Sequence, residues 1–132
     1  MRTLEPPTIA APGSKGLTII AGDPPGTGGA HHRYEIAGMN MHANPSRLVH
    51  DPAPHKQVLL FQNGLVQEAG VNGLTDEALL AIVVDRQRCF QLGPYACPRG
   101  GRVLALLEAA LDEMAGRTRE RIARRVEDTY AV

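Results

Sequence analysis

The sequence predicts an α+β protein, with a small antiparallel β-sheet followed by an antiparallel helical hairpin that assembles into oligomers. Short β-prone runs separated by Gly- and Pro-rich turns occupy the first half, whereas apolar residues recur at helical spacing in the second half. A chain of 132 residues suits one domain, or a small β layer joined to a helical piece. We expect a flexible N-terminal arm over 1–16, a β domain over 17–70 and the hairpin domain over 71–132.

Four runs are expected to supply the strands of the sheet. Residues 17–20 are β-prone, and residues 33–39 alternate polar and apolar side chains. The third run, 57–62, is followed by Asn63-Gly64 and by the fourth run, 65–68. Asn-Gly is the dipeptide preferred in a type I′ turn, so these last two runs are expected to pair as a hairpin.

The first helix is expected over 76–91. Thr75 suits its N-cap, acidic residues occupy its first turn, and Gly93-Pro94 ends it. Its apolar face is expected to consist of Leu79, Ile82, Val83 and Phe90.

The second helix is expected to begin near Arg102. Its apolar stripe is expected to consist of Val103, Leu107, Ala110, Leu111 and Met114. Neither helix can bury its apolar face alone, so the two are expected to pack together as a hairpin. The surplus of apolar surface favours an oligomer, a dimer at least.

The charge balance excludes several classes of protein. With 14 basic and 14 acidic residues the chain is formally neutral, which argues against a binder of long nucleic acid or of membrane surfaces. No apolar run approaches the roughly 18 residues of a membrane span, and no signal peptide is apparent, so a cytosolic protein is expected. Cys89 and Cys97 are then expected to be free thiols.

Motifs typical of catalysis are missing from the sequence. The glycine-rich run 26–32 lacks the lysine of a phosphate-binding P-loop and does not lead into a helix, so we interpret it as a turn. The five histidines have no helical ligand spacing, and no nucleophile elbow or redox motif occurs. We therefore expect a binding protein with no catalytic residue, metal or cofactor.

Arginines concentrate near the C-terminus, where five lie within residues 117–125. On a helix, Arg117 and Arg121 are one turn apart and share a face, which we call the arginine face. Planar, permanently charged guanidinium groups suit a phosphate or pyrophosphate. The alternative is a solvated helix end, where cations interact favourably with the helix dipole.

Other residues complete a candidate binding site for a nucleotide. Phe90 offers a ring on which a base can stack, with Arg86 one turn before it, although Phe90 equally suits a core or interface position. Asn72, Gly73 and Thr75 precede the first helix, where backbone N–H groups favour an anion.

Six blocks of the sequence resemble the phage anti-Thoeris proteins of the first type. The blocks are FQNG at 61–64, GVNGLTDEALLAIV at 70–83, DR at 85–86, CFQ at 89–91, GPYAC at 93–97 and RTRER at 117–121. The resemblance covers about residues 57–130, and little of residues 1–56 can be matched.

The resemblance implies a sponge without enzymatic activity, acting in the cytoplasm of the infected bacterial host. Members sequester cyclic ADP-ribose isomers of the glycocyclic type, made by TIR-domain defence proteins, and several bind cyclic di- or trinucleotides at a separate site. They are hexamers built from dimers, and share their hairpin with the phage anti-CBASS sponge. By this resemblance Phe90, Arg117 and Arg121 hold the ADP-ribose isomer, and residues 72–75 form the oligonucleotide region.

Three alternatives remain open from the sequence. A structural oligomerisation protein would pair its arginines with acidic residues of a neighbouring subunit. A nucleic-acid-binding helical hairpin is favoured by the arginines and opposed by the neutral overall charge. An enzyme that cleaves the signal is the third.

Overall fold

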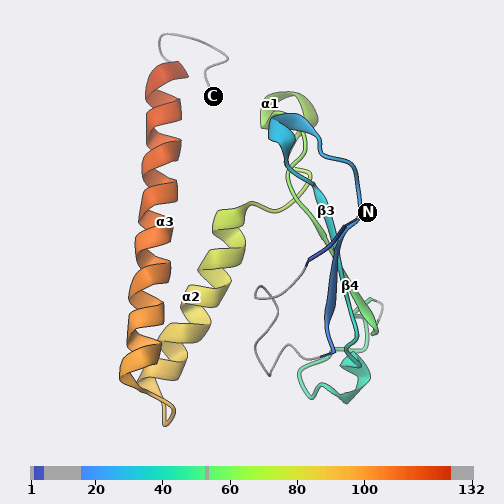
Figure 1. Ribbon diagram of the computed structural model, residues 1–132, viewed down its shortest axis with the longest axis vertical. Coiled ribbons are helices and arrows are strands. Elements are labelled where there is room, and N and C mark those ends of the chain that lie inside the picture. The colour runs from blue at the N-terminus through green and yellow to red at the C-terminus, as the bar shows by residue number, and fades with distance from the viewer. Residues whose placement is uncertain (1, 5–15, 53, 126–132) are drawn as a thin grey trace. The chain divides into compact units, whose positions relative to one another are not determined.

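The computed structural model describes residues 2–4, 16–52 and 54–125, which belong to two compact units (Figure 1). The first unit, residues 1–74, contains an antiparallel sheet, and the second, residues 75–132, contains two long helices. The predicted α+β class is therefore confirmed, with the sheet preceding the helices in the chain. Among the described residues no helix is both long and apolar enough to span a membrane.

The sheet has four strands in the order β1-β2-β3-β4, each antiparallel to its neighbour. The first three predicted runs correspond to β2 (Thr18–Ala21), β3 (Arg33–Ala37) and β4 (Lys56–Leu60). In addition β1 (Arg2–Thr3) pairs with β2, inside the segment expected to be a flexible arm. Residues 5–15 of that arm lie outside the described residues.

In the described part of this unit the connections contain two 3-10 helices, Thr27–Gly29 and Met41–Ala43. The first occupies the glycine-rich run that we interpreted as a turn, and the backbone N–H of Gly26 donates to the carbonyl of Ala30 at 2.8 Å. The second lies in the long connection between β3 and β4.

The predicted hairpin around Asn63-Gly64 is wrong. Gly64 has a positive φ of 95°, as a turn glycine can, but the run after it forms the short helix α1 (Val66–Ala69) instead of a strand. The chain then returns beside β4, where Phe61 and Leu74 form a parallel bridge. The turn preference of Asn63-Gly64 is outweighed by the hydrogen bonds that close the loop between β4 and residue 74. These hydrogen bonds are described below with the candidate site.

The first long helix, α2 (Asp76–Leu92), has the predicted bounds to within one residue. Thr75 is its N-cap as predicted, because its hydroxyl accepts from the backbone N–H of Ala78 at 3.1 Å. At the other end the backbone N–H of Gly93 donates to the carbonyl of Phe90 at 3.2 Å.

The predicted apolar face of α2 is only partly correct. Val84 is the buried residue of the helix at 2% exposure, whereas Ile82 and Phe90 are 58% and 42% exposed. Residues 78–84 are apolar without interruption, so their spacing does not distinguish one face from the next. The helix therefore retains an exposed apolar surface at Ile82, Val83 and Phe90.

The second long helix, α3 (Pro98–Arg125), starts earlier than the predicted Arg102. Pro98 provides a first helical residue with a suitable fixed φ, and the Cys97 thiol accepts from the backbone N–H of Gly100 at 3.3 Å. A Cβ on Gly100 would lie 3.1 Å from the Gln91 side chain, so glycine permits this close approach. The predicted apolar stripe began at Val103, but Val103 is 39% exposed. The next residue, Leu104, is half-buried instead.

The turn between the two helices is held by one side chain. Gln91 accepts from the backbone N–H of Cys97 at 3.0 Å and donates to the carbonyl of the same residue at 3.0 Å. Further along, Arg88 of α2 donates to Glu108 of α3 at 2.7 Å. The helices contact each other in this unit, and both cysteines are exposed free thiols.

Candidate functional site

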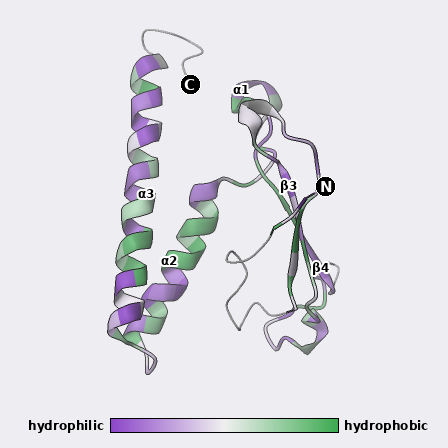
Figure 2. Ribbon diagram, in the orientation of Figure 1, coloured by the Kyte–Doolittle hydropathy of each residue, from purple (hydrophilic) through white to green (hydrophobic). Residues whose placement is uncertain are grey.

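The arginine face lies on the part of α3 that extends beyond α2. The two helices share the turn at 93–97, and α3 has 28 residues against 17 in α2. At 1.5 Å of rise per residue, α3 is therefore longer by roughly 16 Å. Figure 2 shows these last turns of α3 to be mostly hydrophilic. The arginine face is thus not a surface that α2 needs for packing.

Arg117 lines a shallow hollow of about 390 Å³ on α3. Two carboxylates, Glu113 and Glu120, line the same hollow, together with Met114 and Gly116. Among the described residues no carboxylate lies within ion-pair distance of Arg117. A Cβ on Gly116 would lie 3.6 Å from the guanidinium of Arg119, at an ordinary contact distance. Arg121, half-buried and one turn further on, is outside this lining.

Phe90 and Arg86 form a cation–π pair near the other end of the unit. The guanidinium carbon of Arg86 lies 5.5 Å from the centroid of the Phe90 ring. The ring is 42% exposed, so a flat apolar surface remains accessible beside a positive charge. This arrangement can stack a base, and it equally can cover an apolar surface of another chain.

The structure separates these two predicted parts of the site. Phe90 lies in the last turn of α2, whereas Arg117 lies roughly 28 Å along α3 from its start at Pro98, at 1.5 Å per residue. One copy of the chain therefore does not bring the ring and the arginine face together. A site that uses both needs residues from a second copy.

Asn72 closes the loop that leaves β4 and returns to α2. Its side-chain carbonyl accepts from the backbone N–H of Asn63 at 2.9 Å, and its amide donates to the carbonyl of Asn63 at 2.7 Å. Gln62 completes the closure, donating to the carbonyl of Gly70 at 2.8 Å and accepting from the N–H of Asn72 at 3.0 Å. Both polar atoms of the Asn72 side chain are thereby used in hydrogen bonds within the chain.

Gly73 allows the two chain segments at the base of this loop to approach closely. A Cβ on Gly73 would lie 2.6 Å from the carbonyl oxygen of Leu60 and 2.6 Å from the carbonyl carbon of Phe61. The approach permits backbone hydrogen bonds of 2.8 Å on either side, from Gln62 to Leu74 and from Leu74 to Leu60. Among the described residues the backbone N–H groups of Gly73 and Thr75 have no hydrogen-bond partner.

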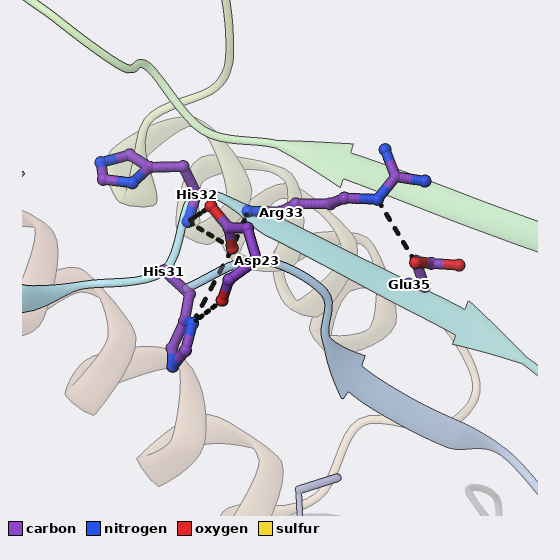
Figure 3. A network of polar contacts seen from close by, with 5 residues as sticks. All are labelled: Asp23, His31, His32, Arg33 and Glu35. Carbon is purple, nitrogen blue, oxygen red and sulfur yellow. Dashed lines mark hydrogen bonds and ion pairs between the residues drawn. The ribbon is translucent and has the colours of Figure 1, made fainter. Parts of the chain in front are cut away.

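A polar corner at the start of β3 was missed by sequence reasoning. The carboxylate of Asp23 accepts from the backbone N–H groups of His32 and Arg33 at 3.0–3.2 Å, and the His31 ring lies against the carbonyl of Asp23 at 2.5 Å (Figure 3). The His32 ring points away from Asp23, and its buried Nδ1 atom has no partner. The signal was weak, because one aspartate in a Gly- and Pro-rich loop does not reveal its partner nine residues away.

The corner borders a hollow of about 280 Å³ in the first unit. The residues that line it come from four separate segments: Asp23, His32, Arg33, Leu60, Phe61, Asn63 and Asn72. The Phe61 ring packs edge-on against Tyr34 with centroids 5.7 Å apart, which fixes one wall. Asn72 is the residue of the predicted site that belongs to this hollow.

Two carboxylates near the corner are held in their charged form. Burial, the largest influence, raises the pKa of Asp23, but the backbone N–H groups of Arg33 and His32 and the adjacent imidazoles outweigh it, so the pKa lies below 3.8. Hydrogen bonds from Lys56 and then from Arg33 hold the pKa of Glu35 below its ordinary 4.5. Both groups therefore make the stability of the first unit depend on pH.

The described residues contain no group of three or more His, Cys, Asp or Glu side chains placed to hold a metal ion.

No protein-family model matches the sequence. A curated protein of Bacillus phage SBSphiJ7, named Thoeris anti-defense 1, is 40% identical to this chain over 70 residues. The match covers 53% of this chain and 49% of the phage protein, so the chain spans about half the length of the curated relative that it matches.

Proposed function

We propose that this protein is a phage-encoded inhibitor of Thoeris defence that binds cyclic ADP-ribose isomers and holds them without cleaving them. The observation that carries the proposal is the 40% identity over 70 residues with the phage protein named Thoeris anti-defense 1. A sponge of this kind acts in the cytoplasm of the infected host, where the signal is made. It lowers the free signal concentration by mass action, so that the effector stays inactive.

The arginine face supports this ligand class. Arg117 and Arg121 are one helical turn apart and project from a part of α3 that α2 does not cover. Guanidinium groups bind phosphate oxygens through paired, charge-assisted hydrogen bonds. The hollow beside Arg117 offers a concave surface for a pyrophosphate, provided that Glu113 and Glu120 turn toward solvent.

The binding site is shared between two copies of the chain. Phe90, backed by Arg86 at 5.5 Å, supplies a stacking surface at one end of the helical unit, and the arginine face lies at the other. Two helical units packed with opposite directions place Phe90 of each copy beside the arginine face of the other. Such a two-fold arrangement yields two equivalent sites per dimer.

Exposed apolar side chains support assembly into a dimer and, from dimers, a hexamer. On the helical unit these are Ile82, Val83, Phe90, Leu92, Tyr95, Val103, Leu106 and Ile122, with exposures from 39% to 91%. A monomer rarely leaves so many large apolar residues uncovered on two adjacent helices. Covering them in a dimer also excludes water from the site, which strengthens the contacts of the arginine face with phosphate.

A second ligand class, cyclic di- or trinucleotides of CBASS signalling, is assigned to the region of Asn72, Gly73 and Thr75. The Asn72 side chain is engaged in loop closure, so the contacts to phosphate come from the backbone N–H groups of Gly73 and Thr75. The loop closure then acts to position these two donors. The two ligand classes use different parts of the molecule and are bound independently.

A signal-depletion assay tests the proposal. A TIR-generated signal is incubated with the full-length protein, the protein is removed by filtration, and the filtrate is applied to a Thoeris effector. We expect the filtrate to be inactive and the heat-denatured protein fraction to release active signal. An active filtrate would contradict the proposal, and an inactive filtrate with no recoverable signal would indicate cleavage instead of sequestration.

A further inference from the structure

Another hollow, of about 350 Å³, lies in the first unit within the connection between β3 and β4. Met41 and Pro52 give it apolar walls, while Asn44, Ser46 and Gln57 contribute polar ones. Its size is at the lower end for small-molecule sites, which begin at roughly 300 Å³. The proposed signal-binding function makes no use of this part of the chain.

Hydrogen bonds within the loop hold the walls of the hollow in place. The backbone N–H of Met41 donates to the carbonyl of Pro54 at 2.7 Å, which ties the two ends of the loop together. The side chain of Asn44 accepts from the N–H of Ser46 at 2.8 Å. A loop fixed in this way loses little conformational freedom when a ligand enters.

Two opposite charges, Arg47 and Asp51, line this hollow without pairing with each other. The guanidinium of Arg47 donates to the backbone carbonyl of Asp51 at 2.9 Å, and one carboxylate oxygen of Asp51 accepts from the N–H of Leu48 at 2.8 Å. Among the described residues no ion pair joins the two side chains. The backbone contacts hold each charge in position and keep the two apart.

Arg47 also contains a donor without an acceptor. Its Nε atom is buried and has no hydrogen-bond partner. An unsatisfied buried donor disfavours the folded state, and the effect is larger for a charged group. A ligand with a negative oxygen in the hollow would relieve this through a small rotation of the guanidinium.

We propose that this hollow binds a small zwitterion of the α-amino acid type. The carboxylate of the ligand pairs with Arg47, and its ammonium group pairs with the second carboxylate oxygen of Asp51. The side chain of the ligand lies against Met41 and Pro52, where apolar contact is available. A simple anion would leave Asp51 beside another negative charge, and a simple cation would face Arg47, so a ligand that carries both charges fits best.

Amide chemical shifts of the isotopically labelled full-length protein provide the test. L-alanine, L-methionine, acetate and methylammonium are each titrated, and the amides of Leu48 and Asp51 report on the hollow. We expect at least one of the two amino acids to saturate these shifts with a dissociation constant of about 1 mM or tighter, and the single-charge probes to bind at least about tenfold more weakly. Absence of saturation by both amino acids, or equal binding of acetate or methylammonium, would overturn the proposal.

Substitutions assign the binding to the two charges. Arg47→Gln removes the positive charge and leaves a shorter polar side chain. Asp51→Asn removes the negative charge at nearly unchanged shape and keeps an oxygen that can accept from Leu48. We expect both to weaken amino-acid binding at least about tenfold. The matched control Arg2→Gln removes an exposed arginine of β1 and is expected to bind as the parent does. If circular dichroism shows that Arg47→Gln is unfolded, the binding measurement on Asp51→Asn is used alone. A folded variant that binds amino acids as tightly as the parent protein would contradict the roles given to Arg47 and Asp51.

Discussion

Phe90 and Arg117 lie near opposite ends of the helical unit. Phe90 is in the last turn of α2, and Arg117 follows Pro98 by roughly 28 Å of α3 at 1.5 Å per residue. The hydrogen bond of 2.7 Å from Arg88 to Glu108 joins the two helices between these positions. A single nucleotide cannot reach both side chains in one copy. Whether the two residues of one site come from different copies of the chain can therefore be tested.

Mixing two variants that each bind weakly tests whether the site is shared. Phe90→Ala and Arg117→Ala homo-oligomers are each expected to bind the cyclic ADP-ribose isomer at least about thirtyfold more weakly than the parent protein. In a dimer of one Phe90→Ala chain and one Arg117→Ala chain, one site keeps both native residues, so we expect calorimetry to show binding of parental affinity at half the parental stoichiometry.

Light scattering must first give a mass at least twice the 14.2 kDa of one chain. A monomer at micromolar concentration, or mixed dimers that bind no ligand, would contradict a shared site.

Substitutions of the arginine face distinguish a phosphate site from a solvated helix end. Removing a guanidinium that binds phosphate in a closed site costs roughly 2–5 kcal/mol. We therefore expect Arg117→Ala and Arg121→Ala to weaken binding at least about thirtyfold, with lysine variants intermediate because lysine keeps the charge and loses the fork. The melting temperature should change little, since like charges on one helix face repel each other. Arg99→Ala, an exposed arginine at the start of α3, is the matched control and should bind normally.

Loop closure by Asn72 gives a prediction about stability. Asn72→Ala removes two hydrogen bonds to Asn63 and is expected to lower the free energy of unfolding of the first unit by about 1–2 kcal/mol. Asn63→Ala is the matched control, because the structure gives its side chain no hydrogen bond, and a change within about 0.5 kcal/mol is expected. Gly73→Ala should destabilise more than either, since its Cβ would lie 2.6 Å from backbone atoms. Equal urea midpoints for Asn72→Ala and Asn63→Ala would show that the closure is not stabilising.

Glu35 gives the sheet a pH-dependent contribution to stability. Its pKa in the folded protein lies below 4.5 because Lys56 and Arg33 donate to the carboxylate. The contribution is complete above pH 4.5 and is lost as the pH falls through the lower folded-state pKa. We expect Glu35→Gln to melt below the parent protein at pH 7 and the difference to shrink at acid pH. Glu68→Gln, on exposed α1, should show no such convergence.

The elements predicted correctly are those in which local preference and tertiary structure agree. Thr75 and Gly93 mark the two ends of α2 and interact there with residues close in sequence. The ends of this helix could therefore be predicted from the sequence. The same holds for the alternation along β3. The start of α3 was misplaced because two glycines follow Pro98, and their unfavourable helix propensity is outweighed by the cap at Cys97 and the contact with Gln91.

Features that depend on distant partners were not predictable. The turn at Asn63-Gly64 is controlled by Asn72, nine residues after Asn63, whose side-chain role the sequence does not reveal. The residues of the candidate site were named from their chemistry, and the helix lengths then showed that Phe90 and the arginine face lie far apart. Helical periodicity gives the face on which a residue lies, but not which copy of the chain completes a site.

Calorimetry with a glycocyclic ADP-ribose isomer, followed by chromatography of the heat-released ligand, tests whether the protein sequesters the signal without cleaving it. We expect saturable binding with a dissociation constant in the nanomolar range, about −12 kcal/mol, and recovery of the ligand unchanged. Absence of binding heat by the parent protein, or recovery of a cleaved product, would contradict it.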